Sequence, residues 1–180
     1  MDDNTEVLVI GGRAGVGKST VAWEVSAQLR GAGIQHTVIE GDFMGQVHPA
    51  PQGDPRRTKI VERNLTAVWA NFAELGHRRL IYTNTLSVMP DMTGVFQRAM
   101  GPDVRIVRIL LTASDRTTVE RLTERERGSE LEDELRSSAR KARLLDKQAP
   151  AEAVRTATDG RPVVDIAREV VAITGWAGAA

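Results

Sequence analysis

The stretch GGRAGVGKST, residues 11–20, constrains the fold of this chain more than any other. It follows a short apolar run, VLVI at residues 7–10, which is typical of a strand buried on both faces. After it, apolar side chains recur at helical spacing up to residue 30, where glycines stop the pattern. A buried strand, a glycine-rich turn and a helix in direct succession predict the start of an α/β domain.

The turn matches the pattern Gly-x-x-x-x-Gly-Lys-Ser, a P-loop. Glycines let the backbone curl so that successive N–H groups point into one concavity and bind phosphate oxygens. The following helix adds the positive end of its dipole. Lys18 is expected to reach the β- and γ-phosphates, and the Ser19 hydroxyl to ligate Mg²⁺. The residues expected to bind the nucleotide here are Gly12, Arg13, Ala14, Gly15, Val16, Gly17, Lys18, Ser19 and Thr20.

The rest of the chain alternates between strand and helix patterns. Further strands are expected at 36–42, 79–85, 104–112 and near 153–160. Helices are expected in the stretch ending at residue 76, at 91–100, at 115–127 with Ser114 or Asp115 as its cap, and at 161–176. Short connections between such elements imply right-handed crossovers and a parallel sheet covered on both faces. We expect a single domain over residues 1–180, since no repeat or linker interrupts the pattern.

Composition excludes several classes of function. Lys plus Arg and Asp plus Glu both total 24, and this balance argues against a general attraction to nucleic acid or to anionic membranes. The chain has no cysteine, which excludes disulfides, thiolate nucleophiles and zinc–thiolate sites. The first apolar run is too short for a signal peptide, and no stretch approaches a membrane span. We therefore expect a cytoplasmic protein.

Asp42 is a candidate for chemistry because it ends the second expected strand. Ligands gather at the carboxyl ends of strands in open α/β sheets, and a carboxylate there can activate an acceptor hydroxyl or hold a Mg²⁺-bound water. A helix cap or a turn aspartate is the alternative interpretation. The following loop, residues 43–55, carries three prolines and two glycines. We expect the acceptor site in residues 43–76, the longest stretch between two strands.

Arginines gather at the end of the fourth expected helix. Arg121 and Arg125 are one helical turn apart and can face the same side, and Arg127 follows them. Arginine can grip phosphate in a fork, stack on adenine or stabilise charge in a transition state. A solvated charged helix is the alternative interpretation. The dense charges that follow predict a solvated helical flap, so that residues 125–147 would form a lid.

Four segments, GGRAGVGKST, EGDFMGQVHP, ERLTERERG and TDGRP, resemble in the same order the small P-loop kinases of the nucleoside-monophosphate-kinase-like group. Gluconate kinase, shikimate kinase, adenylylsulfate kinase and the chloramphenicol phosphotransferase group are the most similar in these segments. The resemblance implies a three-layer α/β P-loop NTPase fold. Its five-stranded parallel sheet would have the order 2-3-1-4-5, with helices on both faces and a helical lid.

The resemblance also implies roles for individual residues. Asp42 would serve the acceptor or the magnesium, and Arg121 and Arg125 would be the paired lid arginines. The turn before the last helix, with Arg161 and Pro162, would lie against adenine. The implied catalytic residues are Lys18, Asp42 and Arg125, the metal ligands Ser19 and Asp42, and the additional nucleotide contacts Arg121, Arg161 and Pro162.

One departure from the group concerns the third strand. Many relatives carry an aspartate at its end, where this chain has Thr83 and Asn84. A neutral side chain cannot replace the charge of a carboxylate, so we expect Ser19 and Asp42 to be the residues that hold magnesium.

The expected function is ATP- and Mg²⁺-dependent transfer of the γ-phosphate to a hydroxyl or phosphate of a small molecule. The alternative is an ATP-binding regulatory module that hydrolyses ATP slowly and has no acceptor. A GTPase is disfavoured, because Asp91-x-x-Gly94 resembles a switch element but no Asn-Lys-x-Asp motif follows. The sequence leaves open whether the acceptor is a sugar acid, a nucleotide, adenylylsulfate or an antibiotic, and it leaves the oligomeric state open.

Overall fold

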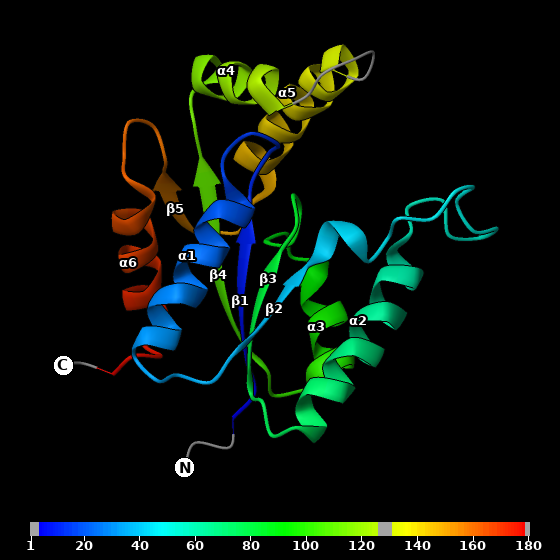
Figure 1. The fold of residues 1–180 in the computed structure, drawn as a ribbon. Helices are drawn as coiled ribbons and strands as arrows, with labels where there is room; N and C mark the ends of the chain where they lie inside the picture. The colour runs from blue at the N-terminus through cyan, green and yellow to red at the C-terminus, as the bar shows by residue number, and fades with distance from the viewer. Residues whose placement is uncertain (1–3, 126–130, 179–180) are drawn as a thin grey trace.

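The computed structural model describes residues 4–125 and 131–178, in which five strands alternate with six α-helices and one 3₁₀ helix (Figure 1). In chain order the elements are β1 (Glu6–Gly11), α1 (Lys18–Gly31), β2 (Thr37–Glu40), η1 (Gly41–Phe43), α2 (Thr58–Glu74), β3 (Arg79–Thr83), α3 (Met92–Met100), β4 (Arg105–Thr112), α4 (Asp115–Arg125), α5 (Leu131–Gln148), β5 (Val154–Ala157) and α6 (Val163–Thr174). None of the described helices is long and apolar enough to cross a membrane.

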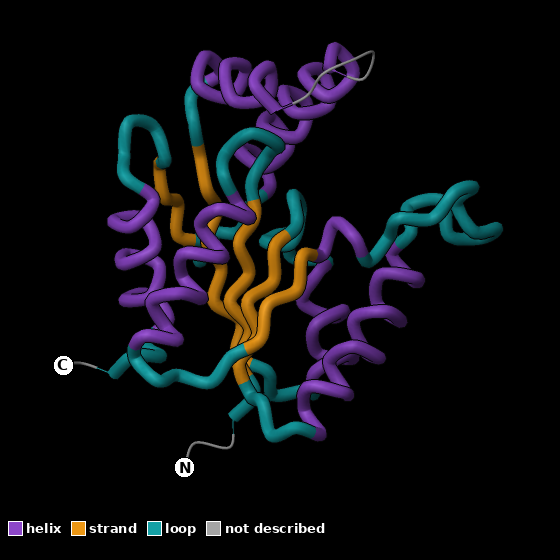
Figure 2. Tube along the Cα trace, in the orientation of Figure 1, coloured by secondary structure: helices purple, strands orange, loops and turns teal. Residues whose placement is uncertain are grey.

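The strands form one parallel sheet in the order β2-β3-β1-β4-β5, which confirms the predicted fold. Strand β1 lies at the centre, with Val7 opposite Leu80 of β3 on one side and Ile106 of β4 on the other. Figure 2 shows the sheet between two layers of helices, with α1 and α6 on one face and α2 and α3 on the other. The order of connections reverses beside β1, and in open α/β sheets ligands bind outside the carboxyl ends of the strands at such a point.

The apolar run of β1 explains why the sheet is covered on both faces. Side chains alternate along a strand, so Leu8 and Ile10 pack in one cluster with α1 and α6. Val7 and Val9 point the other way, into a second cluster with α2 and α3. All four side chains are fully buried, as the unbroken run of apolar residues predicts.

Helix α5 differs from the solvated flap that its charges predict. Leu145 is buried in a small cluster with Val88 and Leu110, so the C-terminal part of α5 belongs to the core. The Ser138 hydroxyl is also buried, and it donates a hydrogen bond to the carbonyl of Ala14, 3.1 Å away. In Figure 1, α4 and α5 lie beyond the carboxyl ends of the strands. The segment between the two helices, residues 126–130 with Arg127, lies outside the described residues.

Gly41 joins β2 to η1 at a point where no side chain fits. A Cβ atom there would lie 2.2 Å from Cζ of Tyr82 and 2.7 Å from the carbonyl oxygen of Thr83. Only glycine at position 41 therefore lets the chain pass this close to β3. This close approach places Asp42 beyond the end of β2.

We expect Gly41→Ala to destabilise the protein by about 1–3 kcal/mol, because the new methyl group forces the backbone away from Tyr82. Gly31→Ala is the control, since a Cβ at that helical position meets no atom within 4 Å. Urea unfolding measures both free energies. Equal stability of the two variants would contradict the close packing at Gly41.

Candidate active site

A cleft of about 900 Å³ opens at the carboxyl ends of β1, β2 and β3. It brings together predicted residues from three separate parts of the sequence. Those that line it are Ala14, Gly15, Gly17, Lys18, Ser19, Thr20, Asp42 and Arg121. The expected acceptor region contributes Gly45, Gln46, Arg56, Arg57 and Val61, and α5 contributes Glu134 and Lys141.

The loop between β1 and α1 has the backbone geometry that its glycines predict. Gly17, the N-cap residue of α1, has a φ of 94°, a left-handed conformation that favours glycine. A Cβ atom at Gly12 would lie 2.6 Å from the carbonyl oxygen of Leu111, so only glycine allows this close approach to β4. No side chain caps α1, and its first turn has no acidic residue. The first N–H groups of α1 therefore have no capping side chain from their own turn and suit an anion at this end of the cleft.

Three loop residues point in different directions. Lys18 lines the cleft, and its Nζ donates to the carbonyl of Arg13 at 3.3 Å. The Arg13 side chain is buried away from the cleft, where Nη1 pairs with Asp115 at 2.5 Å and Nε donates to Thr118 at 3.1 Å. Val16 is buried as well. Arg13 and Val16 therefore hold the loop in place, and only their main chain is suited to bind phosphate.

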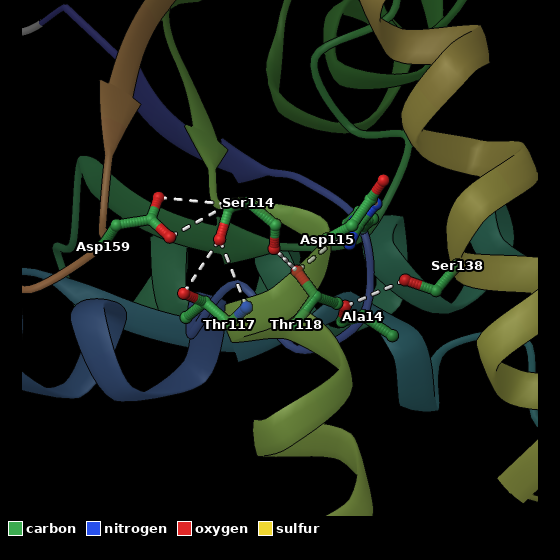
Figure 3. A network of polar contacts seen from close by, with 8 residues as sticks. Ala14, Ser114, Asp115, Thr117, Thr118, Ser138 and Asp159 are labelled. Atoms are coloured by element: carbon green, nitrogen blue, oxygen red, sulfur yellow. Dashed lines mark hydrogen bonds and ion pairs between the residues drawn. The ribbon is translucent and has the colours of Figure 1, made fainter.

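A network of polar contacts joins the start of α4 to the β5–α6 turn, and close to it Ser138 contacts Ala14 of the P-loop (Figure 3). The Ser114 hydroxyl accepts the N–H of Thr117 at 3.2 Å, which confirms Ser114 as the cap of α4. Asp159 accepts the N–H of Ser114 with both carboxylate oxygens, at 3.0 and 3.1 Å. Hydrogen bonds from the Thr117 hydroxyl and from Ser114 lower the pKa of Asp159 to about 2. Asp159 is thus a charged tie between the β5–α6 turn and α4.

Arg121 lies between the P-loop and the β5–α6 turn. Its Nη1 donates to the carbonyl of Gly15 at 3.3 Å and to the Thr158 hydroxyl at 3.1 Å. Besides the cleft, Arg121 lines a smaller cavity of about 210 Å³ together with Arg161. Glu169 holds the guanidinium of Arg161 through a contact of 2.6 Å.

Two further predicted residues, Pro162 and Arg125, have no described contact with this group, for different reasons. Pro162 is the N-cap residue of α6 and is not part of the lining of the smaller cavity. Arg125 is the last residue of α4, and its side chain lies outside the described residues. Its predicted role therefore stays a prediction from the sequence.

Asp42 faces Asn84 across the ends of β2 and β3. The amide Nδ2 of Asn84 donates to Oδ1 of Asp42 at 2.7 Å, while its Oδ1 accepts the N–H of Leu86 at 3.0 Å. The second bond sets the orientation of the amide and aims its NH₂ group at the carboxylate. The neutral residue at the end of the third strand thus holds Asp42 instead of supplying a second charge.

Glu40 is the residue at this site that sequence reasoning missed. One of its oxygens accepts the Ser19 hydroxyl at 2.9 Å, and the other accepts the indole N–H of Trp23 at 3.0 Å. A signal was present, because Glu40 and Asp42 flank a glycine at the end of an expected strand. Their contacts come from α1 and β3, however, and nothing in the local sequence indicates which carboxylate meets which partner.

The donors at this edge suit magnesium. Ser19, Glu40 and Asp42 offer hydroxyl and carboxylate oxygens, which Mg²⁺ prefers, and Ser19 and Glu40 are already in contact. Within residues 4–125 and 131–178, no group of three His, Cys, Asp or Glu side chains is arranged to hold a metal alone.

Residues 7–147 match the model of a protein family described as an AAA domain. No curated protein matches the chain. Among solved structures, the tunicamycin resistance protein of Deinococcus radiodurans is similar with 22% identity and a TM-score of 0.63, over 96% of each chain. A gluconokinase from Sinorhizobium meliloti has 18% identity and a TM-score of 0.57, over 95% of this chain and 91% of that one.

An APS kinase from Mycobacterium tuberculosis, in complex with AMPPNP and APS, also has 18% identity and a TM-score of 0.57. The match covers 95% of this chain and 98% of that chain. At these identities the likeness shows the fold. Together with the family match, it confirms the P-loop kinase-like fold that the resemblance of the four sequence segments implies.

Proposed function

The chain belongs to the AAA domain family, and from that premise we propose that it is an ATP- and Mg²⁺-dependent phosphotransferase. It moves the γ-phosphate to a hydroxyl or phosphate of a small-molecule acceptor. One observation carries the proposal: the P-loop with Lys18 and the carboxylate of Asp42 open into the same cleft. A phosphate-binding loop facing a potential base is the arrangement that phosphoryl transfer requires.

The nucleotide occupies the P-loop side of the cleft. Main-chain N–H groups of the loop and the start of α1 bind the β- and γ-phosphates, and Lys18 neutralises their charge. The adenine ring of the nucleotide lies in the smaller cavity, which Arg121 and Arg161 line. Arg125 follows Arg121 by one helical turn, and in this proposal it stabilises the negative charge that develops on the transferring phosphoryl group.

Magnesium would be held by Ser19 and by the carboxylates of Glu40 and Asp42, directly or through water. When bound, the ion neutralises charge on the phosphate oxygens. Glu40 keeps the Ser19 hydroxyl in a single position, and the Trp23 indole N–H in turn holds Glu40.

Asp42 accepts the proton of the acceptor hydroxyl. The acceptor oxygen then forms a bond to the γ-phosphorus while the bond to the bridging β–γ oxygen breaks and ADP leaves. Asn84 supports this step by holding one carboxylate oxygen of Asp42, which leaves the other for the acceptor.

A panel of acceptors tests the proposal: sugar acids, nucleosides, nucleotides, adenylylsulfate and hydroxyl-bearing antibiotics. We expect at least one to raise ADP release well above the water background and to give a phosphorylated product by mass spectrometry. The alternative, an ATP-binding module without an acceptor, is favoured by the neutral Asn84 at the end of β3. It predicts tight MgATP binding with slow ADP release that no acceptor accelerates.

Arg121→Ala should weaken MgATP binding about tenfold or more, because hydrogen bonds that involve a charged group contribute about 1.5–3 kcal/mol each. Arg116→Ala is the matched control, since Arg116 lies on the same helix, its side chain is 88% exposed, and its one ion pair within the described residues is with Glu120. Calorimetric titration with MgATP measures both. Equal MgATP affinities in the two variants would mean that Arg121 does not contribute to nucleotide binding.

A further inference from the structure

The cleft continues beyond the P-loop into a second cavity on the acceptor side. This cavity, of about 450 Å³, is lined by Gly45, Gln46, Val47, His48 and Arg57. Gly45, Gln46 and Arg57 also line the main cleft. Arg57 therefore stands at the boundary between the two spaces, where it can contact a ligand that enters either one.

The backbone of Arg57 is held in an unusual conformation. Its φ of 58° is the one positive value at a non-glycine position within the described parts of the chain. Such a conformation costs about 1–3 kcal/mol and persists only where the surroundings enforce it. Here the N–H of Arg57 donates to the carbonyl of Asp54 at 2.9 Å, and its own carbonyl accepts the N–H of Val61 at 3.0 Å.

The guanidinium of Arg57 is oriented but not neutralised. Its Nε donates to the carbonyl of Val47 at 3.1 Å, which fixes the plane of the group. Among residues 4–125 and 131–178, neither terminal nitrogen of Arg57 has a hydrogen-bond or ion-pair partner. A fixed fork of two N–H groups with open donors is the geometry in which arginine binds an oxyanion through two parallel hydrogen bonds.

The charges around Arg57 favour an anion. Arg56 also lines the cleft and has no ion-pair partner in the described part of the chain. The nearby Asp54 is buried, and its carboxylate accepts the N–H of Ile60 at 3.0 Å. The residues of the expected acceptor region that line the cleft thus include two arginines and no carboxylate, while Asp42, Glu124 and Glu134 line it from other parts of the chain.

We propose that the acceptor carries an oxyanion, either a carboxylate or a tetrahedral phosphate or sulfate, besides the group that receives the phosphoryl. Arg57 binds this oxyanion with its two terminal nitrogens, and Arg56 adds its charge. The inference rests on the proposed function, since it places the acceptor in the part of the cleft beyond Asp42. It makes an uncharged antibiotic a poor acceptor and an anionic metabolite a good one.

Binding of simple anions tests the subsite without knowledge of the acceptor. Protein saturated with magnesium and AMPPNP is titrated with inorganic phosphate and, separately, with acetate, at ionic strength kept constant with chloride. We expect wild type to bind one of the two, and the preferred anion distinguishes a tetrahedral group from a carboxylate. Arg57→Asn should weaken that binding at least fivefold, and Arg56→Gln should weaken it less.

The variants are chosen to keep the fold. Asparagine tolerates the left-handed conformation better than most residues, so Arg57→Asn removes the guanidinium without disturbing the backbone. Arg63→Gln is the control, because Arg63 is exposed on α2 and lines neither cavity. Urea unfolding checks that all variants are equally stable.

The outcomes separate the two proposals. If AMPPNP with magnesium does not bind, the proposed function fails. If it binds but neither anion does, or if Arg57→Asn binds the anion as tightly as wild type, the oxyanion subsite is refuted and the phosphotransferase stands. Loss of anion binding in Arg57→Asn but not in Arg63→Gln supports the subsite.

Discussion

We expect Lys18→Ala to lower kcat for phosphoryl transfer by about 10²–10³-fold, the range seen when one preorganised electrostatic contact to a developing charge is lost. The Lys18 side chain lines the cleft beside the carbonyl of Arg13, and in the proposed site it would meet the β- and γ-phosphates. Its removal leaves the phosphate charge to the main-chain N–H groups and the metal. MgATP affinity falls as well, because the same charge binds the ground state.

A coupled assay of ADP formation measures this loss, and calorimetry measures the change in affinity. Lys147→Ala serves as the control, because Lys147 is exposed on the last turn of α5. If Lys18→Ala binds MgATP and turns over like wild type, the P-loop has no part in the reaction.

The second large effect is expected from Asp42→Asn, which should lower kcat by about 10²–10⁴-fold, the usual contribution of a general base. The amide has nearly the same shape and can still accept the hydrogen bond from Asn84, but it cannot take a proton. In the proposed site Ser19 and Glu40 would still hold the magnesium, so MgATP affinity should fall far less than kcat, because loss of the base acts on the transition state.

Two quantities are measured on the same preparations: kcat, determined with the best acceptor, and the Kd of MgATP. Asp91→Asn is the control, because Asp91 is exposed just before α3 and lines none of the cavities described here. Unchanged turnover in Asp42→Asn would show that the base is elsewhere. A loss of MgATP affinity as large as the loss of kcat would mean that Asp42 acts mainly by holding the metal and not as the base.

Much of the fold followed from local patterns. The apolar run of β1, the glycines of the loop and the apolar spacing of α1 each involve only a few consecutive residues, and the structure has them as predicted. The strand order was implied by the resemblance and is confirmed. Helix α5 was less predictable, because its charges suggest a solvated segment, while Leu145 is buried in the core and Ser138 is bonded to the P-loop.

The site was harder to predict than the fold. Arg13 lies in the loop motif, but its side chain turns to Asp115 because a buried guanidinium needs an ion-pair partner there. Arg57 is an ordinary residue in the sequence, and its position between two cavities comes from a left-handed turn that no local pattern signals.

By itself the sequence determined that this chain has a phosphate-binding loop between a buried strand and a helix, because glycine geometry and side-chain periodicity are properties of neighbouring residues. Only the tertiary structure decided which polar groups meet at that loop. Ser19 and Glu40 are 21 positions apart, and Asp42 and Asn84 are 42 positions apart. They meet because parallel strands bring the ends of β1, β2 and β3 to one edge of the sheet, and this depends on the packing of the whole domain.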